Sequence, residues 1–335
     1  MNTFFLDRLN SEPHALAFAG QSTPWPVALA DQSANPALDE ALHTHAAAAQ
    51  ALLYPVSAEL LATTGRPVDL FGFEPNPARL GAAAAASASV PGIALTQLGA
   101  LLDAAALGYN PAQAKPVAVL GHSQGVLAVH MVQAICEAGS IDAAAAKIDE
   151  ILAIATLIGV AGTRQARQLG LAARHGEATP MLSVKDITRA QVDALIERVD
   201  VARGPIAVAV TNSATHYVLS GYPEDLAAFG VEVAKEHKRQ AKLREEKVRG
   251  GRVFDPTLEY LDVTLPFHSP LMADAVSQAV AWAEACGINA DHARELAAEV
   301  LLNHVDWAAR VRALMKSTDP SALWVLDFGP GYSVV

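Results

Sequence analysis

A serine lies at the centre of a Gly-His-Ser-Gln-Gly sequence over residues 121–125, between apolar runs at 117–120 and 126–129. A strand, a sharp turn and a helix are the context in which a G-x-S-x-G sequence forms a nucleophile elbow. The turn lifts the serine hydroxyl above the sheet, and the glycines let strand and helix approach each other. This pattern predicts that Ser123 is a nucleophile.

A serine hydroxyl reacts at neutral pH only when a base takes its proton. His268 lies between Pro266 and Pro270, where the chain is expected to return from a small domain to a larger one. A rigid junction of this kind can aim an imidazole across a cleft. The residues alone leave two interpretations open for His268, a general base and a structural histidine. His122 precedes the nucleophile and is expected to point away from it, as a structural or pocket residue.

Composition indicates a globular protein of about two domains, because the chain has 335 residues, 52% of them hydrophobic and 18% charged. No uninterrupted apolar stretch reaches the length of a membrane span, and no basic leader precedes an apolar segment at the N-terminus. Two cysteines cannot form a disulfide framework, and Cys136 is expected to be a small core residue. These features predict a cytoplasmic protein without a metal site.

The net charge of −11 argues against nucleic acid as a partner, since phosphate contacts need a basic surface. Residues 235–252 differ, with eight basic and three acidic side chains. Two interpretations are open for this basic segment. One is a solvated helix, and the other is a docking surface for an anionic partner such as a coenzyme phosphate or an acidic carrier.

Two patterns of elements follow one another along the chain. Residues 14–175 are typical of an α/β fold, with expected strands at 15–19 and 117–120 and helices at 93–107, 126–137 and 142–160. Residues 178–266 give a β-α-β-β-α-β order, which is ferredoxin-like. The strands are expected at 181–184, 206–210, 217–220 and 258–265, and the helices at 189–199 and after Pro223. Helices and a last strand at 323–328 follow.

The simplest account is a small domain inserted into a larger one. Residues 1–177 and 267–335 would form the larger α/β domain, and residues 178–266 the inserted one.

Five motifs together resemble one known family. They are Phe-Ala-Gly-Gln at 18–21, the elbow, Pro-Phe-His-Ser at 266–269, Asn-His-Val-Asp-Trp at 303–307 and Asp-Phe-Gly-Pro-Gly at 327–331. They occur in the order seen in acyl-CoA:acyl-carrier-protein transacylases, the acyltransferases of fatty acid and polyketide synthases. The resemblance covers nearly the whole chain. It implies an α/β-hydrolase-like core with an inserted ferredoxin-like subdomain.

The resemblance also implies roles for site residues. Ser123 would be the nucleophile and His268 the general base, oriented by a backbone carbonyl near Val300. The backbone N–H groups of Gln21 and Gln124 would form the oxyanion hole, which stabilises charge that develops in the transition state.

Substrate-binding positions follow from the same resemblance: Ile158, His122, Asn212 and Phe267. Malonyl-specific members hold the substrate carboxylate with an arginine, whose place Ile158 takes here. A buried carboxylate without a partner is strongly disfavoured, so an acetyl group is expected. The alternative is that Ile158 only packs the helix and that Arg164 or Arg167 binds a carboxylate instead.

The chain looks most like the acetyltransferase domain of type I fatty acid synthases. It would carry acetyl from acetyl-CoA to the pantetheine thiol of an acyl carrier protein, with no permanently bound cofactor. Other acyl-CoA donors, malonyl-CoA among them, and a serine thioesterase or hydrolase are the alternatives. The end of the chain four residues after Gly331 is what we expect of a segment of a larger synthase, whose other domains would be its partners.

Overall fold

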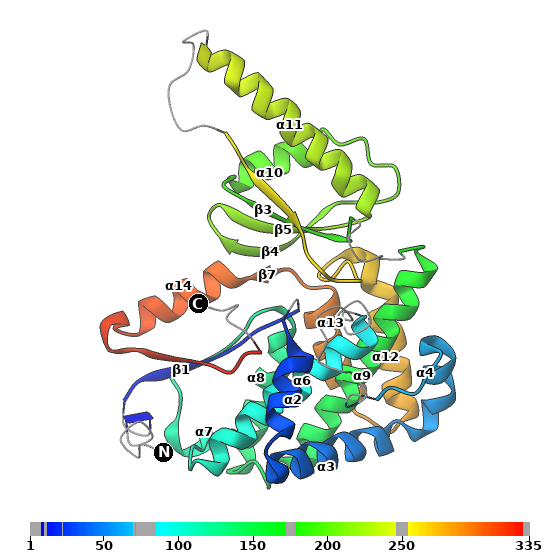
Figure 1. The fold of residues 1–335 in the computed structure, drawn as a ribbon, viewed down its shortest axis with the longest axis vertical. Coiled ribbons are helices and arrows are strands. Elements are labelled where there is room, and N and C mark those ends of the chain that lie inside the picture. Colours follow the sequence, from blue (N-terminus) through cyan, green and yellow to red (C-terminus); the bar gives the residue numbers. More distant parts are fainter. Residues whose placement is uncertain are drawn as a thin grey trace.

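The computed structural model describes residues 8–9, 12–21, 23–69, 71, 85–171, 178–245 and 254–330. These residues form a mixed α/β fold with two sheets (Figure 1). The core sheet has three parallel strands in the order β2-β1-β8, and the second sheet has five strands in the order β6-β3-β5-β4-β7.

The core sheet is centred on β1 (His14–Phe18), all of whose residues are buried. Its neighbours are β2 (Ala118–Gly121) and β8 (Trp324–Asp327). A continuous apolar run is the pattern of a parallel strand that is covered on both faces. Phe18 pairs with Gly121, so the carboxyl ends of β1 and β2 meet where the elbow begins.

Helices make up most of the core around this sheet, with α9 packing against α3, α6, α8, α12 and α13. The helical elements of this part are α2 (Trp25–Ser33), α3 (Pro36–Leu52), η1 (Tyr54–Val56), α4 (Ser57–Thr64), α6 (Ala86–Ala106), α7 (Pro111–Ala114), η3 (Ser123–Gly125), α8 (Val126–Ala138), α9 (Ala145–Gln168), η4 (Pro270–Met272), α12 (Ala273–Ala285), α13 (Ala290–Leu301), α14 (Trp307–Ser317) and η5 (Pro320–Ala322).

The second sheet contains β3 (Met181–Lys185), β4 (Ala207–Ser213), β5 (His216–Ser220), β6 (Thr257–Tyr260) and β7 (Val305–Asp306). With α10 (Arg189–Ile196) and α11 (Pro223–Glu245), its first four strands follow the expected β-α-β-β-α-β order. Alternate residues divide between two cores, because Leu182 and Leu219 pack with α10 and α11, whereas Met181 and Val218 join the main core. The second sheet is therefore covered on both faces.

Strand β7 was not expected from the sequence. It comes from the C-terminal part of the chain and pairs in parallel with β4, through Val210–Val305 and Thr211–Asp306. A strand of two residues has no alternating pattern to detect. It joins the C-terminal part of the chain directly to the second sheet.

Two expectations were wrong. The strand expected at 258–265 ends at Tyr260, because Val263 and Leu265 leave the sheet and pack into the main core. Cys136 is exposed, since α8 buries its opposite face through residues such as Met131 and Ile135. An apolar run on a helix does not fix which residue faces outward.

Helix α6 is long and apolar enough to cross a membrane by length and composition alone. In the protein, fourteen of its residues are buried, among them Gln97 and Thr96. Gln97 donates to the carbonyl oxygens of Ala19 and Gly329, so this helix ties the ends of β1 and β8 together. These contacts are those of a core helix.

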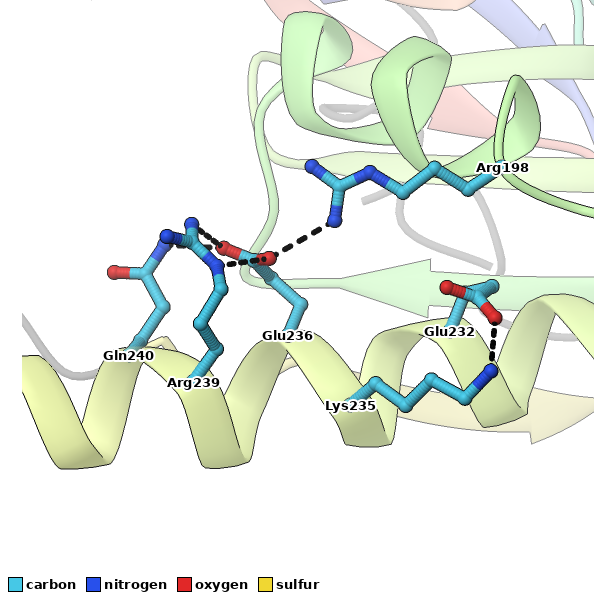
Figure 2. Close-up of polar contacts among 6 residues, drawn as sticks. All are labelled: Arg198, Glu232, Lys235, Glu236, Arg239 and Gln240. Carbon is cyan, nitrogen blue, oxygen red and sulfur yellow. Dashed lines mark hydrogen bonds and ion pairs between the residues drawn. The ribbon is translucent and has the colours of Figure 1, made fainter.

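Part of the basic segment forms the C-terminal half of α11, which extends away from the core sheet (Figure 1). Figure 2 shows that Glu236 accepts hydrogen bonds from Arg198, Arg239 and Gln240, while Lys235 bonds to Glu232. These bonds hold the pKa of Glu236 down at about 2. Lys235 and Arg239 are thus paired within the helix, and the proposed docking role of the segment stays a prediction. Lys247, Arg249 and Arg252 lie outside the described residues.

Substituting Glu236→Gln is expected to lower the free energy of unfolding at pH 7 by about 2 kcal/mol, because Arg198 and Arg239 lose a buried carboxylate partner. Because the pKa of Glu236 is lower in the folded protein than in the unfolded chain, its carboxylate stabilises the fold at pH values above 4.5. This stabilisation is lost as the pH falls from 4.5 toward 2. Urea unfolding between pH 2 and 7 measures both effects. Glu232→Gln on the same helix is the control and should cost less than half as much. Equal losses for the two variants would contradict the role of Glu236.

Candidate active site at the carboxyl end of the core sheet

The elbow is a tight turn between β2 and α8. Ser123 has a φ of +53°, a left-handed conformation that non-glycine residues rarely adopt. A Cβ on Gly121 would lie 2.5 Å from the carbonyl carbon of Gly125, and a Cβ on Gly125 would collide with the carbonyl group of Phe18, so neither position has room for a side chain. The two glycines therefore permit the turn that raises the hydroxyl of Ser123 above the sheet.

The structure brings Ser123 and His268 into direct contact. The distance from Ser123 Oγ to His268 Nε2 is 2.6 Å, and His268 Nδ1 lies 2.8 Å from the carbonyl oxygen of Asn303. A carbonyl oxygen only accepts, so Nδ1 carries the proton and donates it to Asn303. Nε2 is then free to accept the proton of the serine hydroxyl. The carbonyl was expected near Val300, just before the Asn-His-Val-Asp-Trp motif, and it belongs instead to Asn303, the first residue of that motif.

The environment of His268 keeps its imidazole uncharged. Only 2% of the residue is exposed, and this burial lowers the pKa of His268 to about 4. The Asn303 carbonyl raises the pKa, whereas His122, His304 and Arg310 lower it further. At neutral pH His268 therefore has a lone pair available on Nε2, as a general base requires.

The chain at Gly20 and Gln21 passes beside the serine. A Cβ on Gly20 would lie 3.0 Å from the Cβ of Ser123 and 2.7 Å from the carbonyl oxygen of His122. The side chain of Gln21 donates to that of Gln124, which is fully buried and donates in turn to the Val90 carbonyl. The two glutamines expected to supply the oxyanion hole are thus adjacent and held by their side chains.

His122 points away from Ser123, toward the second sheet. Its Nε2 lies 2.8 Å from Asn212 Oδ1, and its ring meets that of Trp307 edge to face at 5.3 Å. Burial lowers the pKa of His122. Asn212 also lies 3.5 Å from His216, which the sequence did not single out. His122 and Asn212 therefore form a bridge between the elbow and β4.

Phe267 and Ile158 are core residues. Phe267 is 2% exposed, and its ring centroid lies 6.5 Å from that of His268. Ile158 is fully buried on α9, and the next residue, Gly159, approaches the backbone of Ala86 at the start of α6. Since Gln124 bonds to Val90 in the same helix, α9 at Gly159 and the elbow at Gln124 both contact the N-terminal part of α6.

The two arginines that could replace Ile158 as a carboxylate ligand are engaged elsewhere. Arg164 donates to Gln278 at 2.8 Å and lies over the ring of Trp282. Arg167 donates to the carbonyl oxygen of Thr63. Both side chains bind neighbouring helices on the outer side of α9.

Sequence comparison connects the chain with fatty acid synthases. Residues 180–260 match the family model described as fatty acid synthase central AT domain. The chain is 27% identical over 209 residues to fatty acid synthase subunit beta of Schizosaccharomyces pombe, covering 56% of this chain and 10% of that protein. It is 26% identical over 287 residues to the fatty acid synthase beta subunit TOXC of Cochliobolus carbonum, covering 73% and 13%. The chain thus spans about a tenth of the length of these relatives.

Structure comparison gives the fold. MCAT from Mycobacterium tuberculosis superposes with a TM-score of 0.61 at 20% identity, covering 96% of this chain and 90% of that one. A malonyl-transacylase solved with a type II PKS acyl-carrier protein superposes with a TM-score of 0.57 at 17% identity, covering 95% and 89%. The family match, the synthase relatives and the transacylase fold together support an acyltransferase domain of a fatty acid synthase.

Proposed function

We propose that this chain transfers an acyl group from an acyl-CoA to the pantetheine thiol of an acyl carrier protein through an acyl ester on Ser123. The observation that carries the proposal is the chain of contacts from Ser123 Oγ to His268 and from His268 to the Asn303 carbonyl. The serine has a buried, neutral base with a fixed orientation, which is what acyl transfer requires.

In the first half-reaction, Ser123 Oγ attacks the thioester carbonyl while its proton passes to His268 Nε2. The backbone N–H groups of Gln21 and Gln124 stabilise the oxyanion of the tetrahedral intermediate. As the intermediate collapses, the C–S bond breaks, and the CoA thiolate takes the proton from His268. In the second half-reaction the carrier thiol attacks the ester, His268 accepts the thiol proton, and it returns this proton to Ser123 as the ester bond breaks.

We further propose that the transferred group is acetyl. Ile158 is buried without a neighbouring cation on its own helix turn, and Arg164 and Arg167 are bonded to other groups. A malonyl carboxylate placed against Ile158 would lose its hydration without gaining a partner. His122, Asn212 and Phe267 are the other proposed substrate contacts.

The wider setting belongs to the same proposal. The strand order β6-β3-β5-β4 supports a ferredoxin-like subdomain at 178–266, inserted into an α/β-hydrolase-like core. Acyl-CoA, a carrier domain and the other domains of a cytoplasmic synthase are the expected partners. The transacylase–carrier complex among the similar structures supports the carrier as one of them.

Incubation with radiolabelled acetyl-CoA is expected to label the native protein at one site and to release one equivalent of CoA. Ser123→Ala should abolish labelling, because the attacking oxygen is removed. Ser269→Ala, which changes the serine beside His268, is the control and should still be labelled. Labelling of Ser123→Ala at the native level would contradict the proposal, and rapid release of free acetate without a carrier thiol would indicate a hydrolase.

The rate of ester formation is expected to stay constant from pH 8 to about 6 and to fall with a midpoint near 4. The pKa of His268 lies below its ordinary value of 6.5, so the imidazole remains neutral through weakly acidic pH and gains a proton only near 4. Rapid-quench measurements of acetyl-enzyme formation across this pH range test the expected profile. Circular dichroism at each pH verifies that the protein is folded. A midpoint at 6.5 or above would show that His268 titrates as an exposed histidine does.

Substituting Ile158→Arg is expected to shift the ratio of acetyl to malonyl loading toward malonyl by at least about tenfold, because a guanidinium can pair with the carboxylate. Competition between acetyl-CoA and malonyl-CoA gives the ratio. Ile158→Met keeps an apolar side chain of similar size and should retain the native preference. If the native protein loads acetyl-CoA and malonyl-CoA equally fast, the proposal that Ile158 excludes a carboxylate is wrong.

A further inference from the structure

We infer that Arg310 is a positioning residue, whose guanidinium holds the end of β2 in place so that Ser123 stays in line with His268. Arg310 donates from Nη1 to the carbonyl oxygen of Gly121 at 2.8 Å, just before the elbow. The inference rests on the proposed roles of Ser123 and His268 and does not depend on which acyl group is carried.

The carbonyl of Gly121 needs a donor from outside the core sheet. Strand β2 lies at the edge of the sheet formed by the described residues, with β1 on one side. The N–H of His122 donates to the carbonyl oxygen of Phe18 in β1, so the Gly121 carbonyl, on the opposite side of the same trans peptide, faces the outer edge. Arg310 supplies there the hydrogen bond that a further strand would give.

The position of this bond matters because Ser123, the proposed nucleophile, has a strained backbone and lies only two residues further along the chain. Ser123 has its left-handed φ two residues after Gly121, and such a conformation persists only when its surroundings fix it. Gly121 and Gly125 have no side chains through which neighbours could hold the turn. A bond to the backbone carbonyl therefore restrains the elbow directly.

Arg310 belongs to a short segment that contacts His268 and the two residues that precede Ser123. The Asn303 carbonyl orients His268, Trp307 packs edge to face on His122, and Arg310 binds Gly121. Residues 303–310 thus set the position of the base and of the nucleophile from one side. The positive charge of Arg310 also lowers the pKa of His122 and of His268, which favours their neutral forms.

The surroundings of Arg310 offer a way to separate its chemistry from its packing. It lines a cavity of about 590 Å³ together with Val129, His130 and Glu299. Removing the side chain would enlarge this cavity, so a small guanidinium compound from solution can enter it. Arg312 lies two residues further along the same helix and is exposed, which makes it a matched control.

The test measures the rate at which Ser123 reacts with a fluorophosphonate probe. In this reaction Ser123 Oγ bonds to phosphorus, fluoride leaves, and the serine proton passes to His268. Arg310→Ala should react at least about tenfold more slowly than the native protein, because a small misplacement of the nucleophile is costly. Ethylguanidinium should restore the rate at least threefold, whereas ethylammonium of equal charge should not. Arg312→Ala should react at the native rate with or without either compound.

Reaction of Arg310→Ala within twofold of the native rate would overturn the inference, as would a slow rate that ethylguanidinium leaves unchanged. If circular dichroism shows that the alanine variant does not fold, Arg310→Met, which keeps a long side chain but has no donor, replaces it, and a native rate for that variant overturns the inference equally. The probe does not require acyl-CoA. If the native protein is not loaded by acetyl-CoA but its reaction with the probe still depends on Arg310, the proposed substrate is rejected. The role of Arg310 then remains intact.

Discussion

The hydrogen-bonded chain from Ser123 through His268 to the Asn303 carbonyl is the constraint on which the rest of the structure depends. Its three members come from segments that are far apart in sequence: an elbow, a loop between two prolines and the end of a helix. Each must be held to within a few tenths of an ångström for a proton to move between them. The core sheet fixes the first member, and the buried loop and α13 fix the other two.

Burial of His268 keeps the base neutral, and it also makes the charged form of the imidazole unfavourable. A histidine that is 2% exposed gives up the hydration of its charged form, which is why its pKa falls to about 4. The same burial leaves the base permanently ready at neutral pH. A backbone carbonyl suffices as its orienting partner, because a neutral imidazole needs one acceptor for Nδ1 and no counter-charge.

The sequence predicted the parts of the site that have a local cause. The elbow was found because strand, glycine turn and helix are consecutive, and Ser123 with its two glycines stands where the pattern placed it. Asn303 and Arg310 were missed for different reasons. A carbonyl oxygen exists in every residue and leaves no mark in the sequence, and Arg310 matters only through the edge of a strand nearly two hundred positions earlier. The β-α-β-β-α-β order was evident from alternation, whereas β7 was too short to alternate, and Val263 and Leu265 continued the alternation outside the sheet, in the main core.

Strand β7 limits how this chain can be divided. The second sheet looks like a removable insertion in sequence, yet its last strand comes from residues 305–306, which lie between α13 and α14 of the surrounding fold. Exchanging residues 178–266 with those of a relative would pair a foreign β4 with the resident β7, directly beside the carbonyl that orients His268. A successful chimera must therefore take two separate segments from the relative, residues 178–266 and the segment that contains β7. Exchanging residues 178–266 alone would leave β4 and β7 from different proteins paired with each other.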